Sequence, residues 1–387
     1  MKRLFWPLLI ITLFSRLFRL DQPSEYIFDE VYHVPSIRVI SQNNPNAYDV
    51  YAHSPEPNTA YDWLHPPLAK LIQATSIKLL GDNSFAWRFP AAVFGTISVA
   101  ALYFLSLTIT KNPGLSLLAA SFFAFDNLQL TMSRIAMNDI FVTTWILLAL
   151  AFFYRKQLLL TGIFTGLALA TKHSAILIYP IFTIFTLIRF FPAKHKLKFI
   201  LTYFYSLILL PLGLYLLSYS QMFLQGSTFT DFFNLHKQIY WYQTTLEATH
   251  SYQSTAWQWP LLIRPVWFYV TSSKSLIANI YNLGNPVVFW AGLLALTVTR
   301  QPFLLISYFS LFFPFILSPR IMFIHHYLPA LPILCLILAS ATWPYRRLKY
   351  FLLGLIILAF LFFYPLNTAL LLPENWLKFW FWLPTWR

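Results

Sequence analysis

Two adjacent acids, in Phe28-Asp29-Glu30, follow an apolar run that spans about residues 4–20. Ionisable groups next to long apolar segments are costly unless water solvates them or the protein uses them. A carboxylate in such a place could take a proton from a substrate hydroxyl. A solvated turn at the end of the apolar run is the alternative interpretation.

Polar residues interrupt later apolar runs at three more places. They are Ser133-Arg134 with Asn138-Asp139, Thr171-Lys172-His173, and Arg320 followed by His325-His326. Taken singly, each has a structural interpretation, because Arg and Lys snorkel to a membrane surface and an acid can cap a helix. Acids, cations and histidines on one face are, however, what a site that handles a phosphate and a proton requires.

No set of metal ligands is predicted. Cys335 is the single cysteine, which excludes an intramolecular disulfide and a zinc site built on several cysteines. His325 and His326 are adjacent and would point about 100° apart on a helix, so a shared metal ion is not expected. We therefore assign no metal residues and no certain cofactor, and leave the question of a divalent cation open.

The elements that position these residues are long apolar segments. Of the 387 residues, 58% are hydrophobic and 10% are charged, too few ionisable groups to cover a soluble fold of this size. The apolar blocks are near the ~20 residues with which a helix crosses a bilayer. They lie at residues 4–20, 90–110, 115–130, 139–154, 158–171, 174–189, 199–218, 286–299, 301–317, 326–343 and 349–366. The pattern predicts an all-α integral membrane protein with about eleven transmembrane helices, several of them short.

Basic residues indicate how these spans are oriented. With the N-terminus inside, the inner loops hold Lys111, Arg155-Lys156, the basic residues of 189–198, Arg300 and the basic residues of 346–349. Short cytoplasmic loops are enriched in Lys and Arg, so the pattern fits this orientation. All thirteen Asp and Glu then lie at or beyond the outer ends of the spans. The net charge of +14 is explained by orientation in a membrane, and we expect no nucleic-acid binding.

Three polar regions lie outside the predicted spans. They are a first outer loop at 21–89, a second at 219–285, and a tail from about residue 367. Residues 67–80 are amphipathic and are predicted to lie along the membrane surface. No repeat or linker divides the chain, so we expect residues 1–387 to form a single transmembrane domain.

The ordered set of motifs resembles one family. The motifs are Phe28-Asp29-Glu30, His65-Pro-Pro-Leu-Ala-Lys70, Ser133-Arg-Ile-Ala-Met-Asn-Asp139, Gly166-Leu-Ala-Leu-Ala-Thr-Lys172, His250-Ser-Tyr-Gln-Ser-Thr-Ala-Trp-Gln-Trp-Pro260, Gly284-Asn-Pro286 and Arg320-Ile-Met-Phe-Ile-His-His-Tyr-Leu-Pro329. Each is weak alone, but their order, from the first span to about residue 330, resembles the protein O-mannosyltransferases. The resemblance implies the GT-C fold of membrane glycosyltransferases, with a large first outer loop that holds the catalytic acid.

The resemblance also implies a reaction and its partners. Family members transfer mannose from dolichyl or polyprenyl phosphate mannose to Ser or Thr of an exported protein, inverting the anomeric carbon. We therefore expect a mannosyltransferase in the cell membrane, with its active site on the extracytoplasmic face. Its partners are then a polyprenyl-phosphate-mannose donor and an exported protein acceptor, and its oligomeric state is not predicted.

The same resemblance implies roles for individual residues. Asp29 is expected to be the general base, and Glu30 to support it or to engage the acceptor. The residues expected to hold the lipid phosphate or the donor are His65, Arg88, Lys172, Arg16, Lys70, Arg134, Asp139, Arg320 and His326. Those expected at the acceptor or sugar are Trp257, Trp259 and Asp62, although the two Trp also fit the aromatic belt of a membrane protein.

These residue types suit the reaction on chemical grounds. A Ser or Thr hydroxyl is a poor nucleophile, so a carboxylate within hydrogen-bond reach must take its proton. The departing lipid phosphate is a weak base that needs no general acid, but its growing charge needs fixed cations. One acid and several basic groups are therefore expected around the sugar.

The chain departs from the family pattern at three places. His173-Ser174-Ala175 stand where an aromatic residue and, two positions on, a glycine are common, so the wall of the lipid site is expected to differ. Met137 and Asn138 replace the usual leucines. The 219–285 loop is too short for the β-trefoil MIR domain of eukaryotic members, which indicates a shorter, prokaryotic enzyme.

Two alternative functions are carried forward. A transferase of the same fold could move another sugar to a glycolipid or a cell-wall glycan, and the Asp-Glu pair does not distinguish the two acceptors. A transporter or flippase would place ionisable residues near the bilayer midplane, often in two repeated halves. Here the acids lie at the outer ends and the Asp-Glu loop has no second copy.

Overall fold

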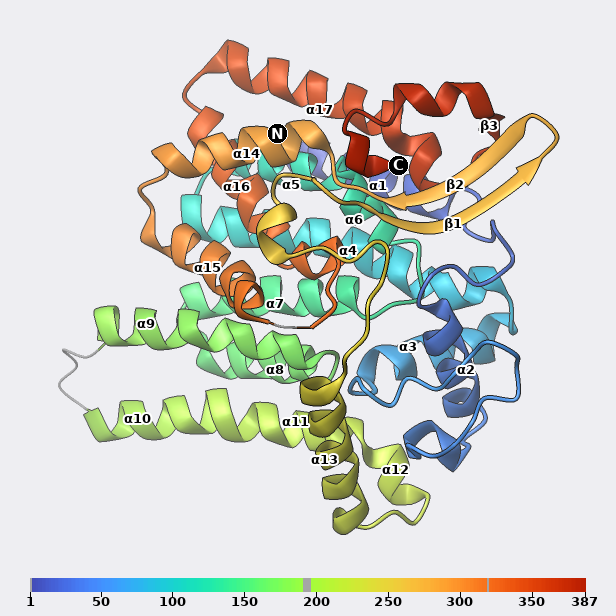
Figure 1. Cartoon of the computed structure of the whole chain (residues 1–387). Helices are drawn as coiled ribbons and strands as arrows, with labels where there is room; N and C mark the ends of the chain where they lie inside the picture. The colour runs from blue at the N-terminus through green and yellow to red at the C-terminus, as the bar shows by residue number, and fades with distance from the viewer. Residues whose placement is uncertain (1, 191–195, 319) are drawn as a thin grey trace.

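The computed structural model describes residues 2–190, 196–318 and 320–387, and these are mostly helical (Figure 1). The α-helices are α1 (Lys2–Leu17), α2 (Glu30–Ser41), α3 (Leu68–Leu80), α4 (Ser84–Thr110), α5 (Pro113–Ala124), α6 (Asn127–Met132), α7 (Asp139–Tyr154), α8 (Leu158–Leu169), α9 (Tyr179–Phe190), α10 (Lys196–Phe204), α11 (Leu210–Ser218), α12 (Ser220–Leu224), α13 (Phe229–Thr245), α14 (Pro286–Val298), α15 (Pro302–Phe312), α16 (Leu331–Thr342) and α17 (Arg346–Asn367). Short 3-10 turns near the site are η2 (His173–Ile178), η5 (Phe313–Leu317) and η6 (Ile324–Tyr327). The segment η3 (Tyr205–Leu209) is a π-helical turn.

The core is a bundle of apolar helices around α4, α5, α7 and α16. Helix α4 packs against α5 and α7, α7 packs against α8, and α16 packs against α5 and α14. Several helices begin at side chains that accept backbone N–H groups, as Asn83 does for α4 and Asn112 for α5. Such caps satisfy donors that have no partner within the helix, which is a particular need in lipid.

Every block that the hydropathy pattern predicts contains a helix, but few of these helices reach full crossing length. Among the described residues, three helices are long and apolar enough to cross a membrane: Ser84–Thr110, Ile200–Ser218 and Arg346–Asn367. The predicted block at 115–130 is broken, because α5 ends at Ala124 and the carboxylate of Asp126 caps the new helix α6. The helical membrane fold is therefore confirmed, whereas the count of eleven spans stays a prediction.

The expectation of an all-α fold is wrong in two segments, which together form a three-stranded sheet. Strands β1 (Val266–Ser273) and β2 (Leu276–Asn282) form an antiparallel hairpin, and β3 (Leu372–Pro373) pairs with the other edge of β2. The sequence of β1 is rich in β-branched and aromatic residues, which favour strands. The hairpin lies within the second predicted outer loop and extends beyond the helices in Figure 1.

The first predicted outer loop is largely folded. The amphipathic segment at 67–80 forms α3, which packs against α2 and α4. These two short helices lie at the same end of the bundle as the hairpin, and α9 and α10 extend toward the opposite end (Figure 1). The start of α2, the start of α7 and the segment after α8 are thereby brought together.

Candidate active site

A cavity of about 570 Å³ lies where these segments meet. Its lining includes six of the residues for which a role at the site is predicted: Asp29, His65, Asp139, Lys172, Arg320 and His326. They come from the start of α2, the loop before α3, the start of α7, the start of η2 and the segment before α16. Helix α13 closes another side with His236, Tyr240 and Gln243.

Asp29 stands directly before α2, at a sharp bend of the chain. Phe28 has a φ of 48°, an uncommon conformation for a bulky residue. Phe28 is held there by its N–H, which donates to the Phe268 carbonyl at 3.2 Å, and by its ring, which stacks on the Phe268 ring with centroids 4.3 Å apart. The hairpin strand β1 thus fixes the residue that precedes the acid.

The surroundings of Asp29 suit a base near neutral pH. Burial raises the pKa of Asp29 from 3.8 to about 7, and the carboxylates of Asp139 and Asp62 add to the rise. Lys172 acts in the opposite direction and lowers the pKa. A carboxyl group whose pKa lies near the working pH is half ionised and half protonated, which is the range in which a general base works best.

Glu30 faces away from the cavity and forms a buried ion pair with Arg88, 2.7 Å between Oε2 and Nη2. Its carboxylate also accepts the N–H groups of Ile27 and Ala136, each at 3.0 Å. The five N–H groups of Arg88 are all used, two on Glu30 and the others on the carbonyls of residues 20, 23 and 25. The pair therefore holds the loop that leads to Asp29, and Arg88 has no donor left for a lipid phosphate.

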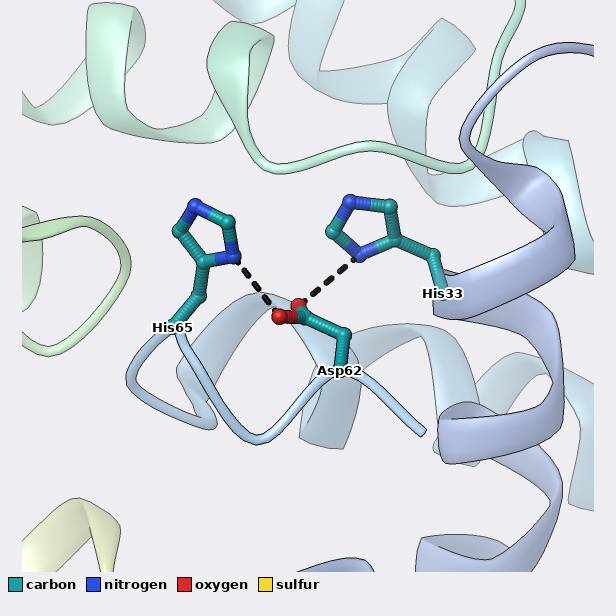
Figure 2. Close-up of side chains that lie close together, drawn as sticks. All are labelled: His33, Asp62 and His65. Atoms are coloured by element: carbon teal, nitrogen blue, oxygen red, sulfur yellow. Dashed lines mark hydrogen bonds and ion pairs between the residues drawn. The ribbon is translucent and has the colours of Figure 1, made fainter. Parts of the chain in front are cut away.

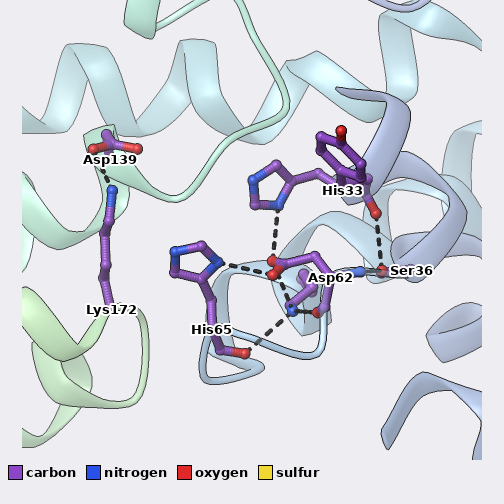
Figure 3. A network of polar contacts seen from close by, with 8 residues as sticks. His33, Ser36, Asp62, His65, Asp139 and Lys172 are labelled. Carbon is purple, nitrogen blue, oxygen red and sulfur yellow. Dashed lines mark hydrogen bonds and ion pairs between the residues drawn. The ribbon is translucent and has the colours of Figure 1, made fainter. Parts of the chain in front are cut away.

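Lys172 and Asp139 form a second ion pair, this one on the cavity wall (Figure 3). Lys172 Nζ donates to Asp139 Oδ1 at 2.7 Å, and Asp139 Oδ2 is buried without a hydrogen-bond partner. Asp139 is the first residue of α7, where a negative charge is favoured by the helix dipole. Lys172 is thus placed at the cavity with its charge partly balanced.

Asp62 is the centre of a third polar cluster, drawn in Figure 2. Its two carboxylate oxygens lie 2.8 Å from His65 Nδ1 and 3.3 Å from His33 Nδ1, and Lys70 Nζ donates to Oδ2 at 3.0 Å. Burial favours the neutral carboxyl, but His65, Lys70 and His33 together hold the pKa of Asp62 well below its usual range. His33 and His65 line the cavity, whereas Asp62 and Lys70 are buried behind them.

Two residues predicted to hold the lipid phosphate or the sugar donor, Arg16 and Arg134, are buried away from the cavity lining. Arg16 donates to the Ala124 carbonyl at 2.5 Å and to the side chain of Gln129. Arg134 donates to the backbone carbonyls of Arg16 at 2.7 Å and of residues 18 and 19. Both guanidinium groups therefore tie the end of α1 to the helices around it.

The two predicted aromatic residues occupy different places. Trp259 is 1% exposed, donates from Nε1 to Ser254 Oγ at 2.9 Å, and stacks on His326 with ring centroids 6.0 Å apart. Trp257 is 54% exposed and lines a neighbouring cavity of about 620 Å³ that shares Arg320 with the first. Trp259 thus supports the cavity wall from behind, and Trp257 lies beside the cavity.

Two of the histidines around the cavity, His33 and His236, were not predicted from the sequence. Six of the nine histidines of the chain line it: His33, His65, His173, His236, His325 and His326. His33 could have been found, because it follows Asp29 by one helical turn and residues four apart share a helix face. His236 could not, because Tyr215 of another helix brings it to the site, with 2.6 Å between the Tyr215 hydroxyl and His236 Nε2.

Two family models match most of the chain. Residues 6–224 match the family described as dolichyl-phosphate-mannose-protein mannosyltransferase, and residues 228–301 match the family described as the C-terminal four TMM region of protein O-mannosyltransferase. The chain belongs to the protein O-mannosyltransferase family. This membership confirms the prediction of a membrane glycosyltransferase of the mannosyltransferase class.

Individual relatives cover nearly the whole chain. The polyprenol-phosphate-mannose–protein mannosyltransferase of Mycolicibacterium smegmatis is 22% identical over 96% of this chain and 90% of its own length. The enzyme of the same name from Corynebacterium glutamicum is 21% identical over 98% of this chain and 91% of its own length.

Solved structures share the fold. The Saccharomyces cerevisiae Pmt1-Pmt2 complex bound to the sugar donor aligns with a TM-score of 0.81 and 15% identity, covering 100% of this chain and 92% of that one. ArnT from Cupriavidus metallidurans bound to undecaprenyl phosphate aligns with a TM-score of 0.59 and 14% identity, covering 90% and 61%. The expected fold of membrane glycosyltransferases is thereby confirmed.

Proposed function

We propose that the protein transfers mannose from a polyprenyl phosphate mannose to Ser or Thr hydroxyls of exported proteins, with Asp29 as general base. The observation that carries the proposal is the half-buried carboxyl of Asp29, with its pKa at about 7, in a cavity that Lys172 and Arg320 also line. Family membership supplies the class of donor, and the named relatives from M. smegmatis and C. glutamicum support mannose and a protein acceptor.

The proposed step is a single displacement. The Asp29 carboxylate takes the proton of the acceptor hydroxyl as its oxygen bonds to the anomeric carbon of mannose. The bond between that carbon and the phosphate oxygen breaks, and its electron pair leaves with the polyprenyl phosphate. The products are the mannosylated protein, polyprenyl phosphate and protonated Asp29. Attack opposite the leaving group inverts the anomeric carbon.

The lipid phosphate is assigned to the cations Lys172 and Arg320 and to two histidines that line the cavity. Lys172, Arg320, His65 and His326 are placed there, and Arg320 Nε is buried without a hydrogen-bond partner. Fixed positive groups stabilise the charge that grows on a leaving phosphate. Arg88, Arg16 and Arg134 are assigned to holding the scaffold, because their contacts are within the chain.

The membrane placement follows the charge pattern. We assign one transmembrane domain of about eleven crossings, with the cavity on the extracytoplasmic face of the cell membrane. Support comes from the acids, which the sequence places at the outer ends of the spans, and from α2 and α3, which lie at one end of the bundle. An exported acceptor would meet the donor at that face.

Asp29→Asn tests the assignment of the base. Purified protein is incubated with labelled polyprenyl phosphate mannose and an exported acceptor protein, and base-labile label on Ser or Thr is measured. We expect a loss of about 10²- to 10⁴-fold in rate, the usual contribution of a general base. Asp49→Asn is the matched control, because Asp49 is an exposed acid of the same outer loop. Wild-type rates in Asp29→Asn would contradict the role of Asp29.

The same assay separates the protein acceptor from the alternative. Label that appears only in glycolipid or cell-wall glycan would show that the fold and donor class are right and that the acceptor is not a protein.

A further inference from the structure

His33, Asp62 and His65 bring a ligand atom each within 4.8 Å of one another (Figure 2). We propose that these three side chains bind a divalent transition-metal ion, of the Zn²⁺ or Mn²⁺ class, at the edge of the donor cavity. Two imidazole nitrogens and a carboxylate oxygen are ligands that these ions accept, and imidazole disfavours Mg²⁺. The role of the ion, which is to assist the departing phosphate, rests on the proposed function. The existence of the metal site does not depend on the proposed function.

The spacing of the three groups fits an ion. Two atoms that each lie ~2.1 Å from a tetrahedral Zn²⁺ are about 3.4 Å apart. His33 Nδ1 and Asp62 Oδ2 are 3.3 Å apart, and His65 Nδ1 and Asp62 Oδ1 are 2.8 Å apart. His33 Nδ1 is also buried without a hydrogen-bond partner, even though a carboxylate oxygen is close. An unpaired buried nitrogen is costly, and a metal ion would satisfy it.

The ligands are held in place by their neighbours. The hydroxyl of Ser36 accepts the Asp62 N–H at 2.7 Å, and Lys70 donates to the backbone carbonyls of Asp62 and His65, the latter at 3.2 Å. Lys70 also donates to the Asp62 carboxylate and fixes its orientation, as hydrogen-bond partners of metal-binding carboxylates commonly do. The positive charge of Lys70 weakens the binding of a cation. An anionic phosphate in the cavity has the opposite effect and should tighten the binding of the metal ion.

The cavity lacks positive charge for the reaction that we propose. Among the described residues of its lining, the Lys and Arg are Lys172 and Arg320, and the acids are Asp29 and Asp139. With Asp29 ionised, as its role as base requires, the charges of these four residues cancel, and Lys172 is already paired with Asp139. The donor brings a phosphate whose negative charge grows as the sugar leaves. A divalent ion on the cavity edge would supply the missing charge.

The orientation of the cluster leaves room for substrate. His33 and His65 line the cavity and Asp62 lies behind them, so the unfilled coordination positions of a bound ion would face the cavity. Three protein ligands with an open position are typical of catalytic rather than structural zinc sites. A phosphate oxygen of the donor could fill that position.

Metal binding is measured on the full-length purified protein after treatment with a chelator. Zn²⁺ is titrated in competition with a chromophoric chelator, and we expect one Zn²⁺ per chain, with Mg²⁺ binding far more weakly. His33→Asn keeps an amide N–H that can face Asp62 but removes the imidazole, and should weaken Zn²⁺ binding by at least about 10- to 100-fold. His53→Ala is the matched control, an exposed histidine of the same loop, and should bind as wild type does.

The outcomes separate the metal site from the reaction. No Zn²⁺ bound by the wild type, or equal binding by His33→Asn and wild type, would overturn the site and leave His65 as a hydrogen-bond partner of Asp62 and His33 as its neighbour. If His33→Asn does not fold, His65→Asn, in the more exposed ligand, serves instead. Full mannose transfer by metal-free protein would reject the role in the reaction but not the proposed function. Bound Zn²⁺ without mannose transfer under any condition would reject the proposed function but not the site.

Discussion

The ionisation of Asp29 should control how the transfer rate depends on pH. The rise in its pKa from 3.8 to about 7 corresponds to about 4 kcal/mol against the charged form. If the carboxylate is the base, kcat/KM should be half-maximal near pH 7 and fall about tenfold for each pH unit below that. An ordinary carboxyl group, with a pKa near 3.8, would give a flat profile across this range.

Lys172→Met provides the perturbation that identifies the titrating group. Lys172 lowers the pKa of Asp29, so its removal should move the acid limb to higher pH. Asp139 raises the pKa, so Asp139→Asn should move the limb to lower pH. Both variants touch the cavity and will transfer mannose more slowly, but the position of the limb on the pH axis does not depend on the maximal rate.

The assay is an initial rate of mannose transfer between pH 5 and 9 with the donor well below its KM. Initial rates matter because the product is a phosphate monoester, and such groups titrate near pH 6 themselves. His65→Asn distinguishes the base from a nearby histidine, since the limb should persist in that variant. A wild-type profile that is flat down to pH 5, or an unmoved limb in Lys172→Met, would refute the reasoning.

Three further predictions concern stability. Between pH 3.8 and about 7 the folded protein keeps a proton on Asp29 that the unfolded chain has released, so the stability of the folded protein falls as pH rises through about 7. Asp29→Asn should therefore raise the apparent Tm more at pH 8 than at pH 5. An equal effect at both pH values would argue against the raised pKa. Arg88→Ala should lower the free energy of unfolding by about 3–5 kcal/mol, because it leaves Glu30 charged and buried without its partner. In thermal unfolding, the double variant with Glu30→Gln should recover part of that loss. Gly162→Ala should lower the free energy of unfolding by about 1–3 kcal/mol, since a Cβ there would lie 1.8 Å from a backbone carbonyl oxygen of the π-helical turn. Gly213→Ala is the control: a Cβ there would meet nothing within 4 Å, so this variant should unfold as wild type does.

Much of the fold was predictable because lipid imposes a simple requirement on the backbone. A chain in hydrocarbon must satisfy its own hydrogen bonds, so apolar blocks become helices, and the structure has a helix in each predicted block. The hairpin was less accessible, since its strands lie in a region read as an outer loop. Their aromatic and β-branched residues were the available signal.

The segments that form the site could be predicted from the sequence, but the role of each residue in the site was less predictable. Asp29, Asp139 and Lys172 were brought together as expected, because their motifs sit at helix ends that face one cavity. Arg88 looked like a phosphate ligand in sequence, but five intramolecular hydrogen bonds use all its donors. Whether an arginine is free to bind a ligand depends on which carbonyls surround it, and residue spacing does not carry that information.

The contact between Phe28 and Phe268 has a consequence for how the enzyme is made. The bend before Asp29 is held by a strand that leaves the ribosome more than 200 residues later. The nascent chain can insert its early helices in the membrane well before the acid has its final support. A chain that stops after residue 224 contains the acid and both cavity ion-pair residues but lacks β1 and α13. Such a fragment is expected to insert and yet remain inactive, so that mannose is transferred only by chains whose synthesis has passed the hairpin.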